Sequence, residues 1–190
     1  ISPSFVHLHT LSYYSLMEGL ISPEELVNTA LKYEMTAIAM SDHRCLTGMV
    51  DFTLACQKAG IQSIYGLTID VEWQNQKGEM VLLVQNREGW SNLCKLSSKL
   101  MVEEGGSKAC LALDDLFQNQ QGLVALTGGQ RSILDFFIQT AQHAKAHTWL
   151  KILKEIYQEN LFFEIQQHTP SQEVHARRMV EAARQSKIPL

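Results

Sequence analysis

The sequence has no stretch of about 18 consecutive apolar residues, the length that a transmembrane helix requires. It also opens without a secretory signal, because polar residues lead directly into a predicted strand. We therefore expect a cytoplasmic protein that makes no contact with membranes.

Cysteine and basic charge are scarce as well. The four cysteines are scattered without a Cys-x-x-Cys motif, which argues against a disulfide framework or a zinc ribbon and favours reduced thiols. The net charge of −4 argues against a basic nucleic-acid module, so contact with DNA would require a local basic patch. With 45% hydrophobic residues, the 190-residue chain is long enough for one domain with a buried core.

Strand and helix patterns alternate along the chain. This alternation predicts parallel strands with helices outside them, and an α/β barrel suits it best. We expect central parallel strands at residues 4–10, 36–40, 61–65, 122–127 and 161–166. We also expect a hairpin from 69–73 and 80–84, and helices at 23–31, 47–59, 88–102, 113–118 and 171–186, with two more within 131–158.

Two histidines lie two residues apart in the first predicted strand. Side chains at this spacing project from one face, so His7 and His9 could bind one metal ion or a close pair. The simpler alternative is that they only pack or form hydrogen bonds. A second pair, Asp42 and His43, follows the next predicted strand, and sites in α/β barrels are built at strand ends. We therefore expect these four side chains to meet at one mouth of the barrel.

Five stretches carry a resemblance to a known family. They are residues 5–9 with 14–19, Ser-Asp-His at 41–43, Asn-Arg-Glu-Gly-Trp-Ser-Asn-Leu-Cys-Lys-Leu at 86–96, 122–128 and 161–166. In this order they resemble PHP (polymerase and histidinol phosphatase) domains, in particular those at the N-terminus of bacterial DNA polymerase III alpha subunits. The resemblance covers residues 1–190 and implies a distorted (β/α)7 barrel, an α/β fold whose C-terminal part is missing from this fragment.

The resemblance also implies a metal site. PHP domains hold up to three ions, usually zinc or manganese, which activate water for phosphoester hydrolysis. By position, His7, His9, Asp42 and His43 match the ligands of the first two motifs. Secondary candidates for ligands are Glu18, Asp70 and Glu79.

Several positions depart from the family pattern. Thr68 stands where the family has a bridging glutamate, and Gly129 stands where many members have a ligating cysteine or histidine. Glu79 takes the place of a frequent histidine, and Asp70 could partly replace the missing glutamate. These departures imply a degraded site that binds at most one divalent ion, and binds it weakly.

We interpret the chain as a scaffold domain of a larger polymerase chain, a DNA-directed DNA polymerase (nucleotidyltransferase) whose own catalytic residues lie elsewhere. The resemblance implies as partners the rest of that chain, a separate proofreading exonuclease subunit, and DNA through the parent polymerase. The first alternative is an active phosphoesterase, either a 3′–5′ proofreading exonuclease or a pyrophosphatase. The second is a stand-alone enzyme of the histidinol-phosphatase type.

Three other histidines are weaker candidates. His143 and His147 lie four residues apart on a predicted helix, where a solvated face is the simpler explanation than a metal chelate. His168 follows the last predicted strand, and we expect it in a loop.

Overall fold

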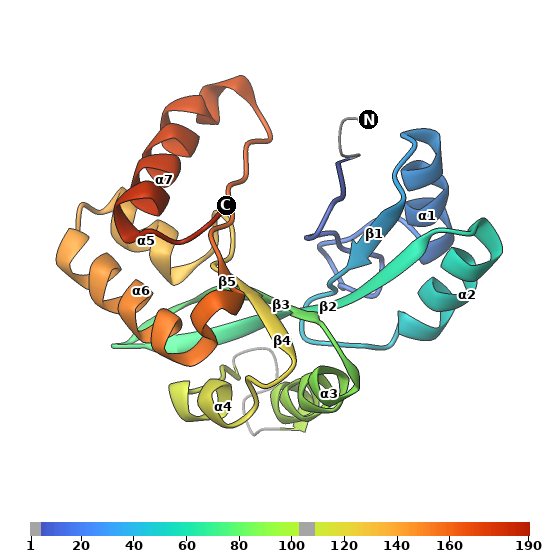
Figure 1. The fold of residues 1–190 in the computed structure, drawn as a ribbon, viewed down its shortest axis with the longest axis horizontal. Helices are drawn as coiled ribbons and strands as arrows, with labels where there is room; N and C mark the ends of the chain where they lie inside the picture. Colours follow the sequence, from blue (N-terminus) through green and yellow to red (C-terminus); the bar gives the residue numbers. More distant parts are fainter. Residues whose placement is uncertain (1–4, 103–108) are drawn as a thin grey trace.

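The computed structural model describes residues 5–102 and 109–190. A five-stranded sheet in the order β1-β2-β3-β4-β5 runs through the molecule (Figure 1). The strands are β1 (Ala37–Met40), β2 (Gln62–Trp73), β3 (Gln76–Val84), β4 (Leu123–Leu126) and β5 (Leu161–Phe162). The pairs β1–β2 and β4–β5 are parallel, whereas β3 is antiparallel to both of its neighbours, so all strands except β3 share one direction.

Helices surround this sheet on its outer side. They are α1 (Pro23–Lys32), α2 (Met49–Ala59), α3 (Arg87–Val102), α4 (Leu113–Gln118), α5 (Ile133–Gln139), α6 (His143–Tyr157) and α7 (Glu173–Ser186), with 3-10 turns at Gln158–Asn160 and Pro170–Gln172. Figure 1 shows α1 and α2 beside β1 and β2, α3 and α4 beneath the middle strands, and α5 to α7 on the side of β5. The architecture is a mixed α/β fold consistent with a distorted (β/α) barrel, as predicted.

Local sequence signals explain several of these boundaries. At the start of α1, the Ser22 hydroxyl accepts from the backbone N–H of Glu25, and the Glu25 carboxylate accepts from the N–H of Ser22. This reciprocal pair, with Pro23 at the first helical position, is a capping box. The hairpin between β2 and β3 turns at Gln74 and Asn75, whose φ angles of 50° and 62° fit a two-residue type I′ turn.

The prediction of a regular strand at residues 4–10 is wrong. Residue 4 lies outside the described residues, and residues 5–10 form no strand although they run beside β1. The carbonyls of His7 and Thr10, three residues apart, accept from the amides of Ala39 and Ser41, which are two apart. The extra residue breaks the ladder as a bulge does.

Two other strand predictions need correction. The segments predicted at 61–65 and 69–73 are one continuous strand, β2. The strand predicted at 161–166 ends at Phe162, because the next amides find other partners: Phe163 N–H donates to the Pro189 carbonyl and Glu164 N–H to the Thr127 hydroxyl.

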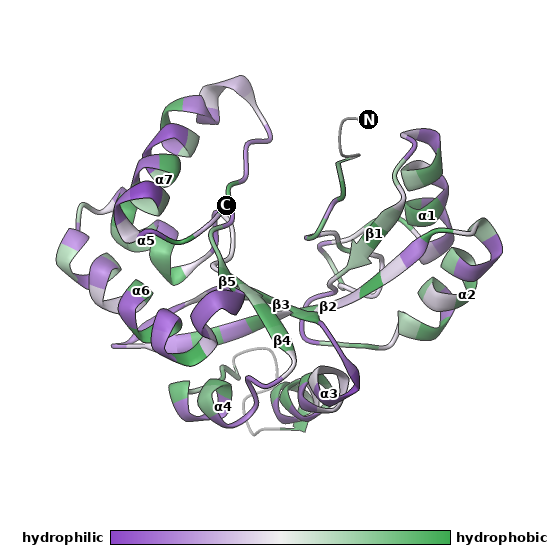
Figure 2. Ribbon diagram, in the orientation of Figure 1, coloured by the Kyte–Doolittle hydropathy of each residue, from purple (hydrophilic) through white to green (hydrophobic). Residues whose placement is uncertain are grey.

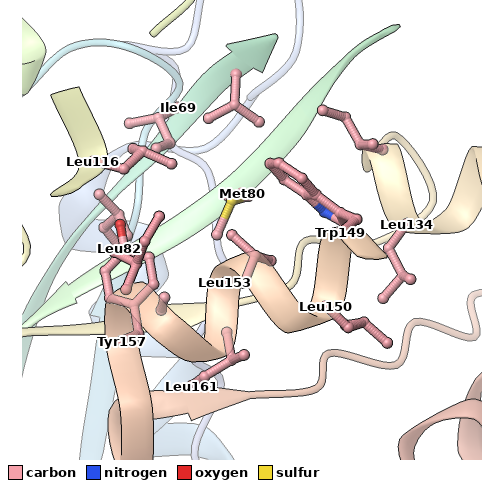
Figure 3. Packing of buried hydrophobic residues seen from close by; sticks show 14 of the residues in the cluster. Ile69, Met80, Leu82, Leu116, Leu134, Trp149, Leu150, Leu153, Tyr157 and Leu161 are labelled. Carbon is pink, nitrogen blue, oxygen red and sulfur yellow. The ribbon is translucent and has the colours of Figure 1, made fainter. Parts of the chain in front are cut away.

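The main hydrophobic core lies between the sheet and α3 to α7. Figure 3 shows Trp149 and Leu153 of α6 directed toward Met80 of β3, and Trp149 stacks on Trp73 with ring centroids 5.5 Å apart. A smaller cluster, with Phe52 at its centre, joins α1 and α2 to β1. Figure 2 shows hydrophobic residues along the strands and hydrophilic ones on the outer helix faces. Within the described residues, no helix combines the length and apolar character that spanning a membrane demands.

Candidate metal centre

Three predicted ligands meet where β1 ends and the hairpin begins. His43 follows β1, and Asp70 of β2 lies directly opposite Glu79 of β3 in the ladder. One ligand atom from each of the three lies within 4.8 Å of the others, and His43 Nε2 is 3.0 Å from Asp70 Oδ2. Within residues 5–102 and 109–190 this is the group of at least three such side chains that could hold a metal ion. One imidazole and two carboxylates suit a divalent ion.

An exposed arginine, Arg131, contacts the same cluster. Arg131 Nε lies 2.9 Å from Glu79 Oε1, and its Nη2 lies 2.9 Å from Glu18 Oε2. Glu18 in turn is 3.2 Å from His43 Nδ1, and Arg44 Nε is 3.6 Å from Asp70 Oδ2. The carboxylates therefore already have cationic partners from the protein itself.

The pKa values reflect this crowding. Hydrogen bonding to Arg131 lowers the pKa of Glu18, and the nearby His43 adds to the effect. Burial raises the pKa of Glu79, and the attraction of Arg131 and His43 does not fully offset it. For His43, burial opposes protonation, but the hydrogen bond to Asp70 and the surrounding carboxylates outweigh it and raise the pKa. The surroundings of His43 thus favour its protonated, positively charged imidazole.

We expect the Glu18–Arg131 pair to give a defined acid response. Because the folded-state pKa of Glu18 is lowered, its contribution to stability is present above the unfolded value of 4.5 and is lost as the pH falls through the folded value. Glu18→Gln should lower the free energy of unfolding by about 1 kcal/mol at pH 7, a modest value because both side chains are partly exposed. Urea denaturation across the acid range checks this. A difference from wild type that persists in strong acid would contradict it.

His9 lies in a neighbouring polar group. Its Nδ1 is 2.7 Å from Glu164 Oε1 and its Nε2 is 3.2 Å from the Thr68 hydroxyl. The amide of Gln166 donates to Glu164, and the Thr68 hydroxyl donates to the Ser41 carbonyl. Both ring nitrogens of His9 are therefore engaged by side chains of the protein.

Gln166 fills the space next to Gly129. A β-carbon added at Gly129 would lie 2.0 Å from the Gln166 side chain. A cysteine or histidine at position 129 could therefore reach the site only if Gln166 moved, so the two residues are matched to one another.

Asp42 forms hydrogen bonds with the loop at residues 12–15 and lies outside the His43–Asp70–Glu79 cluster. It is fully buried, and its carboxylate accepts from the Ser12 N–H at 2.6 Å, the Ser12 hydroxyl at 2.7 Å and the Ser15 hydroxyl at 2.6 Å. The Ser15 oxygen in turn accepts from the backbone N–H of His43 at 2.9 Å. Asp42 thus holds the 12–15 loop, which positions His43.

The remaining predicted residues lie outside these groups of contacts. His7 is exposed, and its ring packs edge-on against Phe5 with centroids 4.8 Å apart. His143 and His147 are exposed on α6, and His168 is exposed in the loop before α7. Their settings agree with the simpler expectations of a solvated helix face and a loop.

The family model for the PHP domain matches residues 7–168. The chain belongs to the PHP domain family. Among curated relatives, this PHP domain is similar to DNA polymerase III subunit alpha of Rickettsia bellii, with 28% identity over 98% of the chain and 16% of that protein. The corresponding protein of Aquifex aeolicus is 30% identical over 100% of the chain and 18% of its own length. The chain thus spans less than a fifth of the relatives it matches.

A solved structure supports the fold. A candidate metal-dependent phosphoesterase from Bifidobacterium adolescentis superposes with a TM-score of 0.58 at 13% identity, over 96% of this chain and 83% of that one. At this identity the likeness shows the fold alone.

Sequence reasoning missed Arg131 and Glu164 as members of the PHP domain's polar centre. Arg131 follows the strand predicted at 122–127 and Glu164 lies at the end of the one predicted at 161–166; these two strands share one direction, and this placement was the available signal. The charge of Arg131 gave no reason to count it among metal ligands, since guanidinium does not bind cations.

Proposed function

We propose that the chain is the N-terminal PHP domain of a cytoplasmic bacterial replicative DNA polymerase and acts there as a scaffold. The similarity to DNA polymerase III alpha subunits along nearly the whole chain supports this assignment. The parent protein would carry the DNA-directed polymerase activity and the contact with DNA. The rest of that polymerase chain and a proofreading exonuclease subunit are the proposed partners.

The position of Arg131 carries the scaffold proposal. Its guanidinium remains charged at every physiological pH and lies between Glu18 and Glu79, and Glu79 belongs to the group that could hold a metal ion. A divalent ion bound by Glu79 would meet this positive charge a few ångströms away, and the repulsion opposes binding. The Arg131 guanidinium would thus replace part of the charge that metals supply in an active PHP site.

One ion still fits the ligands present. His43, Asp70 and Glu79 would hold it, and zinc or manganese suits this donor set. A bound ion of this kind would polarise water or a phosphate oxygen. A second, bridged ion lacks a carboxylate at position 68, because Thr68 contributes a hydroxyl that already donates to the Ser41 carbonyl.

Removing the positive charge of Arg131 should strengthen metal binding. We expect Arg131→Gln to raise the affinity for Mn²⁺ or Zn²⁺ about tenfold, because the repulsion disappears and Glu79 is freed. Isothermal titration calorimetry measures the change. Arg178→Gln, at an exposed arginine of α7, is the matched control and should bind as wild type does. Equal affinities of the Arg131 and Arg178 variants would contradict the role given to Arg131.

The decisive experiment for the scaffold proposal is a hydrolysis assay on the full-length protein. Single-stranded DNA, pyrophosphate and nitrophenyl phosphate are incubated with Mn²⁺ or Zn²⁺, in wild type and in His43→Ala. We expect that wild type shows no metal-dependent hydrolysis that is lost in His43→Ala. Cleavage by wild type that is lost in His43→Ala would overturn the scaffold proposal.

That result would favour the second candidate function, a metal-dependent phosphoesterase acting as an exonuclease or pyrophosphatase. The observation in its favour is the convergence of His43, Asp70 and Glu79. A stand-alone phosphatase of the histidinol-phosphate type is the weaker form of this alternative, because the chain is similar to DNA polymerase III alpha subunits.

A further inference from the structure

A groove of about 660 Å³ lies between α2 and the start of α3. Its walls include Val50 and Leu54 of α2 and Arg87 and Trp90 of α3, and the first residues of β2 form part of its lining. A volume of this size is typical of ligand sites. The groove shares no residue with the His43–Asp70–Glu79 cluster, so an inference about it does not depend on the proposed function.

The part of β2 in the groove has a strand on one side only. Residues 62–65 pair with β1, whereas the pairing of β2 with β3 begins at Gly66 opposite Leu83. At Gly66 the pairing of β2 changes from β1 to β3, and the backbone is tightly packed there. A β-carbon at Gly66 would lie 2.8 Å from Leu83 and 2.9 Å from Ser41. Figure 1 shows β2 passing from the side of β1 to the side of β3.

The free edge exposes backbone groups to the groove. The N–H of Gln62 donates to the Thr36 carbonyl, on the β1 side. Because backbone groups of successive residues in a strand point to opposite edges, those of Ser63 and Tyr65 point to the other edge. Both residues line the groove, and the Ser63 and Thr53 hydroxyls donate to the Tyr65 hydroxyl, which fixes that wall.

This edge lacks the usual protection. Soluble proteins commonly guard free strand edges with charged side chains or proline. Of the lining residues only Arg87 is charged, and none is proline. Val50 and Leu54 are 68% and 59% exposed, so the groove offers apolar surface beside unpaired backbone.

Arg87 sets the charge of the occupant. It is exposed at the N-terminal end of α3, where the helix dipole also favours an anion. Among the ion pairs of the described residues, none includes Arg87. A carboxylate on the occupant would therefore complement it.

We propose that the groove binds an extended peptide segment of a partner protein, which adds a strand to β2 along residues 62–65. Backbone groups of the peptide pair with Ser63 and Tyr65, as in β-strand addition. Its apolar side chains contact Val50, Leu54 and Trp90, and an acidic residue contacts Arg87.

The test uses the full-length protein and fluorescein-labelled nine-residue peptides of alternating valine and threonine. One peptide carries two aspartates at its N-terminal end and another carries them at its C-terminal end. Matched control peptides carry lysine in place of aspartate, or proline at alternate positions. We expect one acidic peptide to bind in fluorescence anisotropy and both control types to bind at least about tenfold more weakly, because strand addition needs N–H groups and Arg87 needs an anion.

Variants locate the binding site. Val50→Asp should weaken binding about tenfold, whereas Val174→Asp, at a valine of α7 with 63% exposure, should leave it unchanged. Arg87→Glu should also weaken binding of the acidic peptide and improve binding of the lysine peptide. Hydrogen–deuterium exchange should slow in the segment 62–66 when the peptide binds.

Several outcomes would overturn the proposal. They are no saturable binding up to about 1 mM, proline peptides that bind as well as the others, or equal effects of the Val50 and Val174 substitutions. Concentration-dependent dimerisation in sedimentation that Val50→Asp abolishes would assign the groove to a second copy of the chain. Preferential binding of a helical peptide would likewise replace strand addition with another mode.

Discussion

Asp42→Ala should lower the free energy of unfolding by about 3 to 5 kcal/mol, with EDTA present so that no metal contributes. The reason is the fully buried carboxylate, which accepts three hydrogen bonds from Ser12 and Ser15. Its loss leaves three donors unpaired in the interior, and each buried unpaired group costs about 1 to 3 kcal/mol. Urea denaturation followed by circular dichroism measures the change.

Two variants sharpen this experiment. Asp114→Ala removes an exposed aspartate of α4 and should change stability by no more than about 0.5 kcal/mol. Asp42→Asn keeps the size of the side chain and one acceptor oxygen, so its effect should lie between the other two. An Asp42→Ala protein that is as stable as the Asp114 variant would show that Asp42 is not the anchor of the 12–15 loop.

Trp149→Ala should lower the free energy of unfolding by about 3 to 5 kcal/mol, because the side chain is fully buried in the main core. The indole stacks on Trp73, and the cavity left by its removal would be bounded by rigid elements of the sheet and of α6. Denaturant unfolding of the two proteins gives the difference.

Trp149→Phe tests the contribution of the aromatic ring separately from that of the indole N–H. The indole nitrogen of Trp149 is buried and has no hydrogen-bond partner among the described residues. Phenylalanine keeps an aromatic ring without this N–H, so the substitution should cost less than about 1.5 kcal/mol. Phe117→Ala, at a phenylalanine that is 61% exposed, is the control and should be nearly neutral. A Phe variant as unstable as the Ala variant would mean that the indole nitrogen has a partner that matters.

The polar residues around His9 and His43 contact the positions at which the sequence departs from the family pattern. Gln166 occupies the space that a side chain at position 129 would need, and it donates to Glu164 beside His9. Where metals would neutralise carboxylates, Arg131 lies between Glu18 and Glu79. A cysteine introduced at position 129 would therefore meet the Gln166 side chain, and a metal bound by Glu79 would lie next to the charge of Arg131.

The sequence by itself determined the elements whose causes are local. The capping box at Ser22 and Glu25, the C-terminal cap at Gly60 and the helical spacing of apolar residues each act within a few residues of the chain, so the helices were predictable. The PHP motifs, read in order, were also sufficient for the family, because their residues stand in the sequence itself.

Only the tertiary structure decided which polar groups pair. Asp42 turns to Ser12 and Ser15, while Arg131 reaches Glu18 across 113 residues of sequence, and no local pattern encodes either choice. The early end of β5 likewise depends on hydrogen-bond partners that distant segments supply, and the loss of regular pairing at residues 5–10 depends on how this segment lies against β1. A buried charge or amide takes whichever partner the packed fold brings within about 3 Å, and that geometry exists only after the sheet and helices have assembled.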